Sequence, residues 1–163
     1  MSGIQCSFQR CEKKYFLSPT QQQALLAAMA GHTRRDEYGA YTICNTYYDT
    51  ADWQLIRASI EKPAYKEKLR MRSYGTPAEN GRVFAELKKK CGGVVYKRRI
   101  TATPGQAEAL LALRTPGADF GQIGQELEWF CRRCRPQPRV FIGYDRLAYA
   151  GIDDPGLRIT TDT

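Results

Sequence analysis

The chain has 163 residues, of which 25 are Lys or Arg and 17 are Asp or Glu, so its formal net charge is +8. This length suits one domain with a sizeable core, and the excess of positive charge favours acidic partners such as phosphates, nucleic acid or an anionic membrane. No apolar run approaches the ~20 residues of a membrane span, and no apolar signal-peptide segment stands at the N-terminus, so we expect a cytoplasmic protein without a membrane segment.

The first part of the chain is predicted to contain two strands and two helices. Ser18-Pro19-Thr20-Gln21 combines an N-cap residue, a proline at the first helical position and a capping-box glutamine, so a helix should begin at Pro19. The expected elements are a strand over residues 6–17, a helix over 19–30, a polar loop over 33–40, a strand over 41–49 and a short helix over 51–60.

Three strands are then predicted in quick succession, and Gly92-Gly93 joins the second to the third. A diglycine favours a two-residue hairpin, because the central residues of such turns often need positive φ. Thr103-Pro104-Gly105-Gln106 repeats the capping pattern and opens a helix that ends near Leu113. The other expected elements are strands over residues 65–74, 82–91, 94–103, 139–149 and 157–163, and a helix over 120–133. Residues 1–163 therefore read as a single α+β domain built on antiparallel strands.

Basic residues recur at every second position in several predicted strands. From Lys66 to Arg72, four cations alternate with Glu67 and two apolar residues. Because strand side chains point alternately to two faces, these cations share one face. The same alternation gives a basic character to at least five predicted strands, with a few carboxylates among the cations. The residues that share a face within one strand are Arg10, Glu12 and Lys14, then Glu86, Lys88 and Lys90, then Lys97 and Arg99; Arg146 and Arg158 lie in the last two strands.

Two interpretations of these basic faces stay open at this point. The first is a sheet whose polar face meets water, which is usual for antiparallel sheets. The second is a barrel with a polar interior, where cations need a compensating anion because unpaired buried charge is costly. A thin oligophosphate would pair with several cations at once. Carboxylates among the cations would then hold a divalent metal, and Mg²⁺ or Mn²⁺ suits a chain that lacks a Cys/His cluster.

Seven motifs occur in the order found in a known family. They are residues 8–17 (FQRCEKKYFL), 45–50 (NTYYDT), 65–75 (YKEKLRMRSYG), 83–90 (VFAELKKK), 95–99 (VYKRR), 144–146 (YDR) and 157–163 (LRITTDT). Together they resemble the VTC domain, the polyphosphate-polymerase branch of the triphosphate tunnel metalloenzymes. The resemblance implies an antiparallel tunnel barrel with helices packed outside. It also implies transfer of the terminal phosphate of ATP onto a growing polyphosphate chain, with a divalent metal, Mn²⁺ or Mg²⁺.

The resemblance also implies which side chains contact phosphate. The residues that match family motifs are Lys14, Arg70, Arg72, Lys88, Lys97, Arg146 and Arg158. Candidates supported mainly by their place on a basic face are Arg10, Lys66, Lys68, Lys90 and Arg99. Glu12 and Glu86 are the candidate metal ligands, and no catalytic residue is assigned.

This sequence departs from the family pattern at its C-terminal end. In the family, later strands follow the Asp-Thr element and carry a metal-binding Glu and a further tunnel lysine, and this sequence ends before both. We therefore expect an incomplete barrel that lacks the family's last strands. We also expect this polypeptide to bind phosphate chains weakly and to have little catalytic activity by itself.

Other functions of the same surface stay open. A tripolyphosphate hydrolase would use the same tunnel, and a non-catalytic module would bind polyphosphate or inositol polyphosphate without turnover. Nucleic acid is a less favoured partner, because Tyr65 and Tyr96 fall opposite the basic faces, where they cannot stack bases between the cations. The sequence leaves open the oligomeric state, any membrane partner and the physiological phosphate acceptor.

Overall fold

The structure is a computed structural model that describes residues 12–61 and 63–163. These residues form two compact units. The α1 unit contains residues 12–40 and Leu147–Asp162, and the sheet unit contains Tyr41–Arg146 with Thr163. Residues 6–11 of the predicted first strand lie outside the described residues, and so does Arg10, a candidate phosphate-binding residue.

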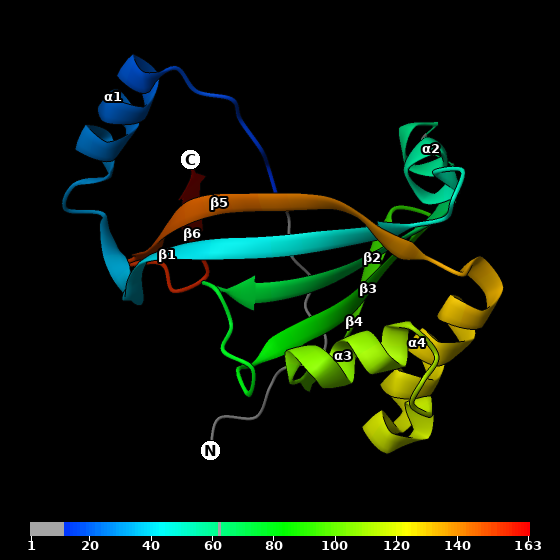
Figure 1. The fold of residues 1–163 in the computed structure, drawn as a ribbon. Helices are drawn as coiled ribbons and strands as arrows, with labels where there is room; N and C mark the ends of the chain where they lie inside the picture. Colours follow the sequence, from blue (N-terminus) through cyan, green and yellow to red (C-terminus); the bar gives the residue numbers. More distant parts are fainter. Residues whose placement is uncertain (1–11, 62) are drawn as a thin grey trace. The chain divides into compact units, whose positions relative to one another are not determined.

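The described part of the chain contains four α-helices, which agree closely with the predicted ones (Figure 1). Both capping boxes form: Ser18 Oγ accepts from the Gln21 amide at 3.3 Å, and Thr103 Oγ1 accepts from the Gln106 amide at 3.3 Å. These bonds satisfy amides at the helix start that have no partner within the helix. The helices are α1 (Pro19–Met29), α2 (Gln54–Ile60), α3 (Pro104–Leu111) and α4 (Gly121–Cys134), and a short 3-10 helix (Gly117–Phe120) precedes α4.

Within the described residues, six strands form one sheet that does not close into a barrel. They are β1 (Thr33–Asp49), β2 (Tyr65–Tyr74), β3 (Val83–Cys91), β4 (Val94–Ala102), β5 (Gln137–Gly151) and β6 (Arg158–Asp162). Their order is β4-β3-β2-β1-β5-β6 (Figure 1). The pairs β1–β2, β2–β3 and β3–β4 are each antiparallel. This confirms the predicted α+β fold with an incomplete antiparallel barrel.

The prediction of a polar loop over residues 33–40 was wrong, because β1 already begins at Thr33. Backbone pairing explains the difference: the Ile152 amide donates to the His32 carbonyl at 2.9 Å. A partner distant in sequence thus holds a polar segment in extended form, whatever its local propensity. The predicted strand over residues 6–17 was also wrong in its described part, since residues 12–17 are exposed and have no regular secondary structure.

The core of the sheet unit lies between one sheet face and two helices. Leu69 on β2 and Leu87 on β3 point to this face and pack with Leu127 and Phe130 of α4. In Figure 1, α3 and α4 lie along this side of β3 and β4. Since strand side chains alternate, the neighbouring residues of β2 and β3 are directed to the opposite face. None of the described helices has the length and apolar character needed to cross a membrane.

Candidate functional site

Strand register brings the predicted cations of β2, β3 and β4 onto one face of the sheet unit. We call this surface the cationic face. Its rows of opposed residues follow from the pairing: Lys66 with Lys90, Lys68 with Lys88, Arg70 with Glu86, Lys88 with Lys97 and Glu86 with Arg99. The Cβ atoms of directly opposed residues are about 4.5–5.5 Å apart, so charges in one row interact strongly.

One row of the cationic face consists of three lysines. Lys88 on the middle strand has Lys68 on one side and Lys97 on the other. Like charges placed directly opposite each other destabilise a sheet. A bound anion that lies across the row would turn this repulsion into attraction.

The next row is organised by a buried carboxylate. Glu86 is only 1% exposed, and its Oε2 accepts from Arg70 Nε at 2.7 Å. Its Oε1 lies 2.7 Å from Lys97 Nζ and 3.8 Å from Arg99 Nη1. Three cations from two flanking strands thus surround a single carboxylate, which leaves a net charge of +2 in this cluster.

Burial and neighbouring charge act together on the protonation of this cluster. Burial raises the pKa of Glu86, but Arg70 and Lys97 lower it by more, so the pKa of Glu86 lies below its ordinary value. Burial also lowers the pKa of Lys97, and the attraction of Glu86 offsets this only in part, because Arg99 and Arg70 add like charge. The Glu86 carboxylate therefore stays ionised at neutral pH.

Arg72 lies in a third row and has neutral partners. Its side chain is buried, at 8% exposure, and its Nε donates to Asn45 Oδ1 at 2.8 Å. Its Nη2 donates to the Tyr144 hydroxyl at 3.3 Å. Asn45 is itself fixed, because its Nδ2 donates to the Ile142 carbonyl at 3.2 Å. Within residues 12–61 and 63–163, Arg72 forms no ion pair, so its charge is buried without a carboxylate.

A model of the VTC domain family matches residues 9–163. The chain belongs to the VTC domain family. This membership connects it with polyphosphate metabolism. A search of curated proteins finds no match.

The VTC fold brings together most of the residues predicted to bind phosphate. Arg70, Arg72, Lys88, Lys97 and the weaker candidates Lys66, Lys68, Lys90 and Arg99 share the cationic face. Arg146 belongs to the same unit, and its Cζ lies 5.3 Å from the centre of the Tyr144 ring, whose hydroxyl contacts Arg72. Lys66 donates to the Ser59 carbonyl at 3.1 Å.

Two other candidates of the VTC domain lie in the α1 unit. Lys14 Nζ is 3.7 Å from Glu12 Oε1, and both side chains are exposed. Arg158 Nη2 is 3.4 Å from Asp36 Oδ2. Their roles in phosphate binding stay predictions.

Sequence reasoning did not assign a role to three uncharged side chains at this site. Asn45 and Tyr144 hold Arg72, and the Tyr47 hydroxyl accepts from Arg70 Nη1 at 3.2 Å. A signal was present, since Asn45 and Tyr47 are two residues apart on β1 and so share a face. Residues 41–49 of β1 carry no Lys or Arg, so no charge pattern marked this part of the strand.

The described residues do not fit a metal centre held by the protein. No group of three or more His, Cys, Asp or Glu side chains is placed to bind an ion in the part of the VTC domain that the structure describes. Glu86 already uses both oxygens for cations. Glu12, the other predicted ligand, lies in the α1 unit beside Lys14.

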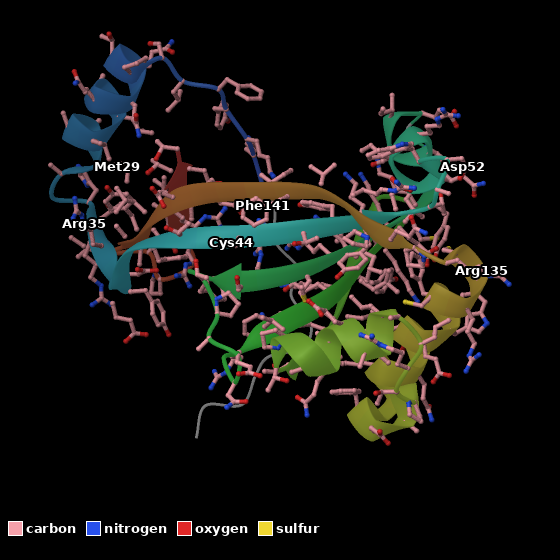
Figure 2. All side chains as sticks on the ribbon, in the orientation of Figure 1. Met29, Arg35, Cys44, Asp52, Arg135 and Phe141 are labelled. Atoms are coloured by element: carbon pink, nitrogen blue, oxygen red, sulfur yellow. The ribbon has the colours of Figure 1, made fainter. Side chains whose placement is uncertain are left out.

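The sheet unit also has a hollow of about 680 Å³ away from the cationic rows. It lies between the start of α2 and the end of α4, near Asp52 and Arg135, which Figure 2 labels. Its Arg133 is already paired with Glu67. The hollow is therefore a weaker candidate for anion binding than the cationic face.

Proposed function

We propose that the cationic face binds a linear phosphate chain. The observation that carries this proposal is Arg72, a buried guanidinium that only neutral partners contact within the described residues. Leaving a buried charge without a counter-ion is costly. A phosphate oxygen would supply the missing negative charge, and guanidinium groups bind phosphate with two parallel hydrogen bonds.

The arrangement of the rows favours an extended ligand over a single phosphate ion. Alternate residues of one strand are about 6.6 Å apart, so Lys68, Arg70 and Arg72 spread charge along β2 over roughly 13 Å. The lysine row adds charge across the sheet, through Lys88 and Lys97. A chain of linked phosphates can contact cations in several rows, which orthophosphate cannot do.

The reaction that we propose is ATP-dependent polyphosphate synthesis. A terminal oxygen of the growing chain attacks the γ-phosphorus of ATP and forms a new P–O–P bond. The bond from the γ-phosphorus to the β,γ-bridging oxygen breaks, and ADP leaves with the electron pair. Phosphoryl transfer depends on positioning and on neutralising charge at the phosphate oxygens. Arg70, Arg72, Lys88 and Lys97 would supply that charge.

We assign the expected divalent ion to the substrate. ATP binds Mg²⁺ or Mn²⁺ through its phosphate oxygens, so the ion can enter together with the nucleotide. The described side chains offer no set of free carboxylates for it. The requirement for Mn²⁺ or Mg²⁺ should therefore follow the nucleotide concentration.

A binding measurement tests the first part of this proposal. Titration calorimetry with tripolyphosphate should show binding that a single-stranded oligonucleotide of equal charge does not displace. Replacing Lys88 by Met should weaken binding by about tenfold, which corresponds to the loss of one charge-assisted contact. The matched control is Arg114→Met, because Arg114 is exposed and lies outside the cationic face. Equal losses in both variants would contradict a specific site.

An activity measurement tests the second part. The chain is incubated with ATP and Mn²⁺, and long polyphosphate is separated from orthophosphate on a gel. Polyphosphate as the product supports the polymerase and contradicts the expectation that this polypeptide has little activity by itself, whereas orthophosphate alone indicates a hydrolase. Tight tripolyphosphate binding without either product would favour a non-catalytic polyphosphate-binding module. That alternative has one observation behind it: Glu86, the buried carboxylate of the face, is fully engaged with cations.

A further inference from the structure

We propose that Glu86 is a positioning residue that fixes the spacing of Arg70, Lys97 and Arg99 for phosphate binding. This inference rests on the proposed function. It concerns a residue that carries the same charge as the ligand and would therefore be expected to repel it.

The contacts of Glu86 show how one carboxylate can organise three cations. Glu86 lies on β3, between Arg70 on β2 and the two β4 residues Lys97 and Arg99. Its two oxygens have separate tasks: Oε2 receives Arg70, at 2.7 Å from Nε and 2.6 Å from Nη2, while Oε1 faces Lys97 and Arg99. The carboxylate thus ties together cations of the two strands that flank β3.

The environment of Glu86 restricts its own freedom as well. Its side chain is among the largest fully buried ones, in a position directly opposite Arg70 on one side and Arg99 on the other. Arg70 has a second fixed contact in the Tyr47 hydroxyl, and the Arg99 guanidinium lies over the Phe84 ring at 4.6 Å. Arg70 and Arg99 therefore each have one contact to the carboxylate and one uncharged support.

Two physical effects of Glu86 on a bound polyanion have opposite signs. Coulomb repulsion alone predicts that removing its negative charge tightens binding. Pre-organisation predicts the reverse, because Lys and Arg side chains that are no longer held must be ordered when the ligand binds. The three cations would also repel one another and separate. We infer that the second effect is the larger, since the carboxylate contacts all three cations directly.

The decisive variant is Glu86→Gln, which keeps the shape of the side chain and removes its charge. One end of the amide is a donor, so it cannot accept from Arg70 and from Lys97 together. Glu79→Gln is the matched control, because it makes the same chemical change at an exposed position in the loop between β2 and β3. Both variants raise the net charge by one.

Titration calorimetry with tripolyphosphate then separates the two effects by sign. We expect Glu86→Gln to bind about tenfold more weakly than wild type, or 1.4 kcal/mol, and Glu79→Gln to bind as tightly as wild type or slightly more so. Binding by Glu86→Gln that equals or exceeds wild type overturns the inference. If wild type itself shows no binding, the proposed function fails, and this outcome is distinct from the failure of the inference alone.

A second measurement covers the case in which Glu86→Gln does not fold. Glu86→Asp keeps the charge but moves the carboxylate back by one methylene, and it is combined with Lys97→Met in a double-mutant cycle on tripolyphosphate affinity. A positioning residue acts through Lys97, so the two losses should be clearly less than additive. Fully additive losses would contradict the inference. The Arg70 Nε–H signal in nitrogen-15 spectra gives a readout of positioning without ligand, and it should lose its protection from exchange in Glu86→Asp.

Discussion

Lys68 on β2 lies directly opposite Lys88 on β3. Directly opposed like charges destabilise a sheet by a few tenths of a kcal/mol. This opposed pair of like charges should therefore cost stability in the free protein, and a bound polyanion would recover it.

Replacing Lys68 by Gln should raise the free energy of unfolding without ligand by about 0.2–1 kcal/mol, because one opposed pair of like charges is removed. The same variant should gain less stability from added tripolyphosphate than wild type does. Thermal unfolding with and without the ligand measures both effects. Lys89→Gln serves as control: it lies on the opposite face and pairs with Glu126 at 3.5 Å, so it should gain no stability.

Replacing Arg72 by Lys should weaken tripolyphosphate binding by about tenfold or more, because an ammonium cannot reproduce the planar two-point contact of a guanidinium. Calorimetric titration provides the measurement. Arg98→Lys changes the same residue type on the other face, where Arg98 pairs with Glu126 at 2.7 Å, and it should leave the affinity unchanged. An Arg72→Lys variant that binds like wild type would remove the main support for the proposed function.

The stability of the protein should fall on acidification partly through Glu86. The folded-state pKa of Glu86 lies below its ordinary value of 4.5, so the unfolded state binds the proton first as the pH falls. Glu86 therefore stabilises the fold above its unfolded-state pKa, and this contribution is lost as the pH falls through the folded-state pKa. Urea unfolding of wild type and Glu86→Gln from about pH 6 down to about pH 3 should show a difference in stability that shrinks with acidity. A difference that does not change with pH would contradict this.

The cysteines of the sheet unit should react with thiol reagents at very different rates. Burial raises the pKa of Cys131 to about 12, whereas Cys91 is exposed at the end of β3. Alkylation requires the thiolate and access to it, so Cys91 should be modified in the native protein and Cys131 only after unfolding. Mass spectrometry after timed iodoacetamide treatment gives the order. Early modification of Cys131 would indicate that α4 opens readily from the sheet.

Local patterns predicted the helices and the composition of the cationic face. Ser18 and Thr103 begin their helices as capping boxes, and the alternation in β2 separates cations from core residues as expected. The diglycine hairpin fixes the pairing of β3 with β4, so the opposition of Lys88 and Lys97 also follows from the sequence. These features depend on neighbours within a few residues.

Longer-range relationships could not be predicted in the same way. The register of β2 against β3 crosses the loop of residues 75–82, whose length sets no unique pairing. The opposition of Arg70 to Glu86 depends on that register. Whether Glu86 pairs with cations or is left to bind a metal depends on it as well. The hydrogen bonds from Arg72 to Asn45 and Tyr144 join residues 27 and 72 positions apart, which no local pattern reveals.

Because the side chains of β2 alternate between the core and the proposed ligand surface, both surfaces depend on the same residue register of this strand. Deleting one residue near the start of this strand would exchange its two sides, and it would turn Arg70 and Arg72 towards α4 while Leu69 faced water. Substitutions can alter either surface by itself, but a frame change of one position would destroy both together. Evolutionary drift in this strand should therefore tolerate exchanges of side chains and exclude insertions and deletions.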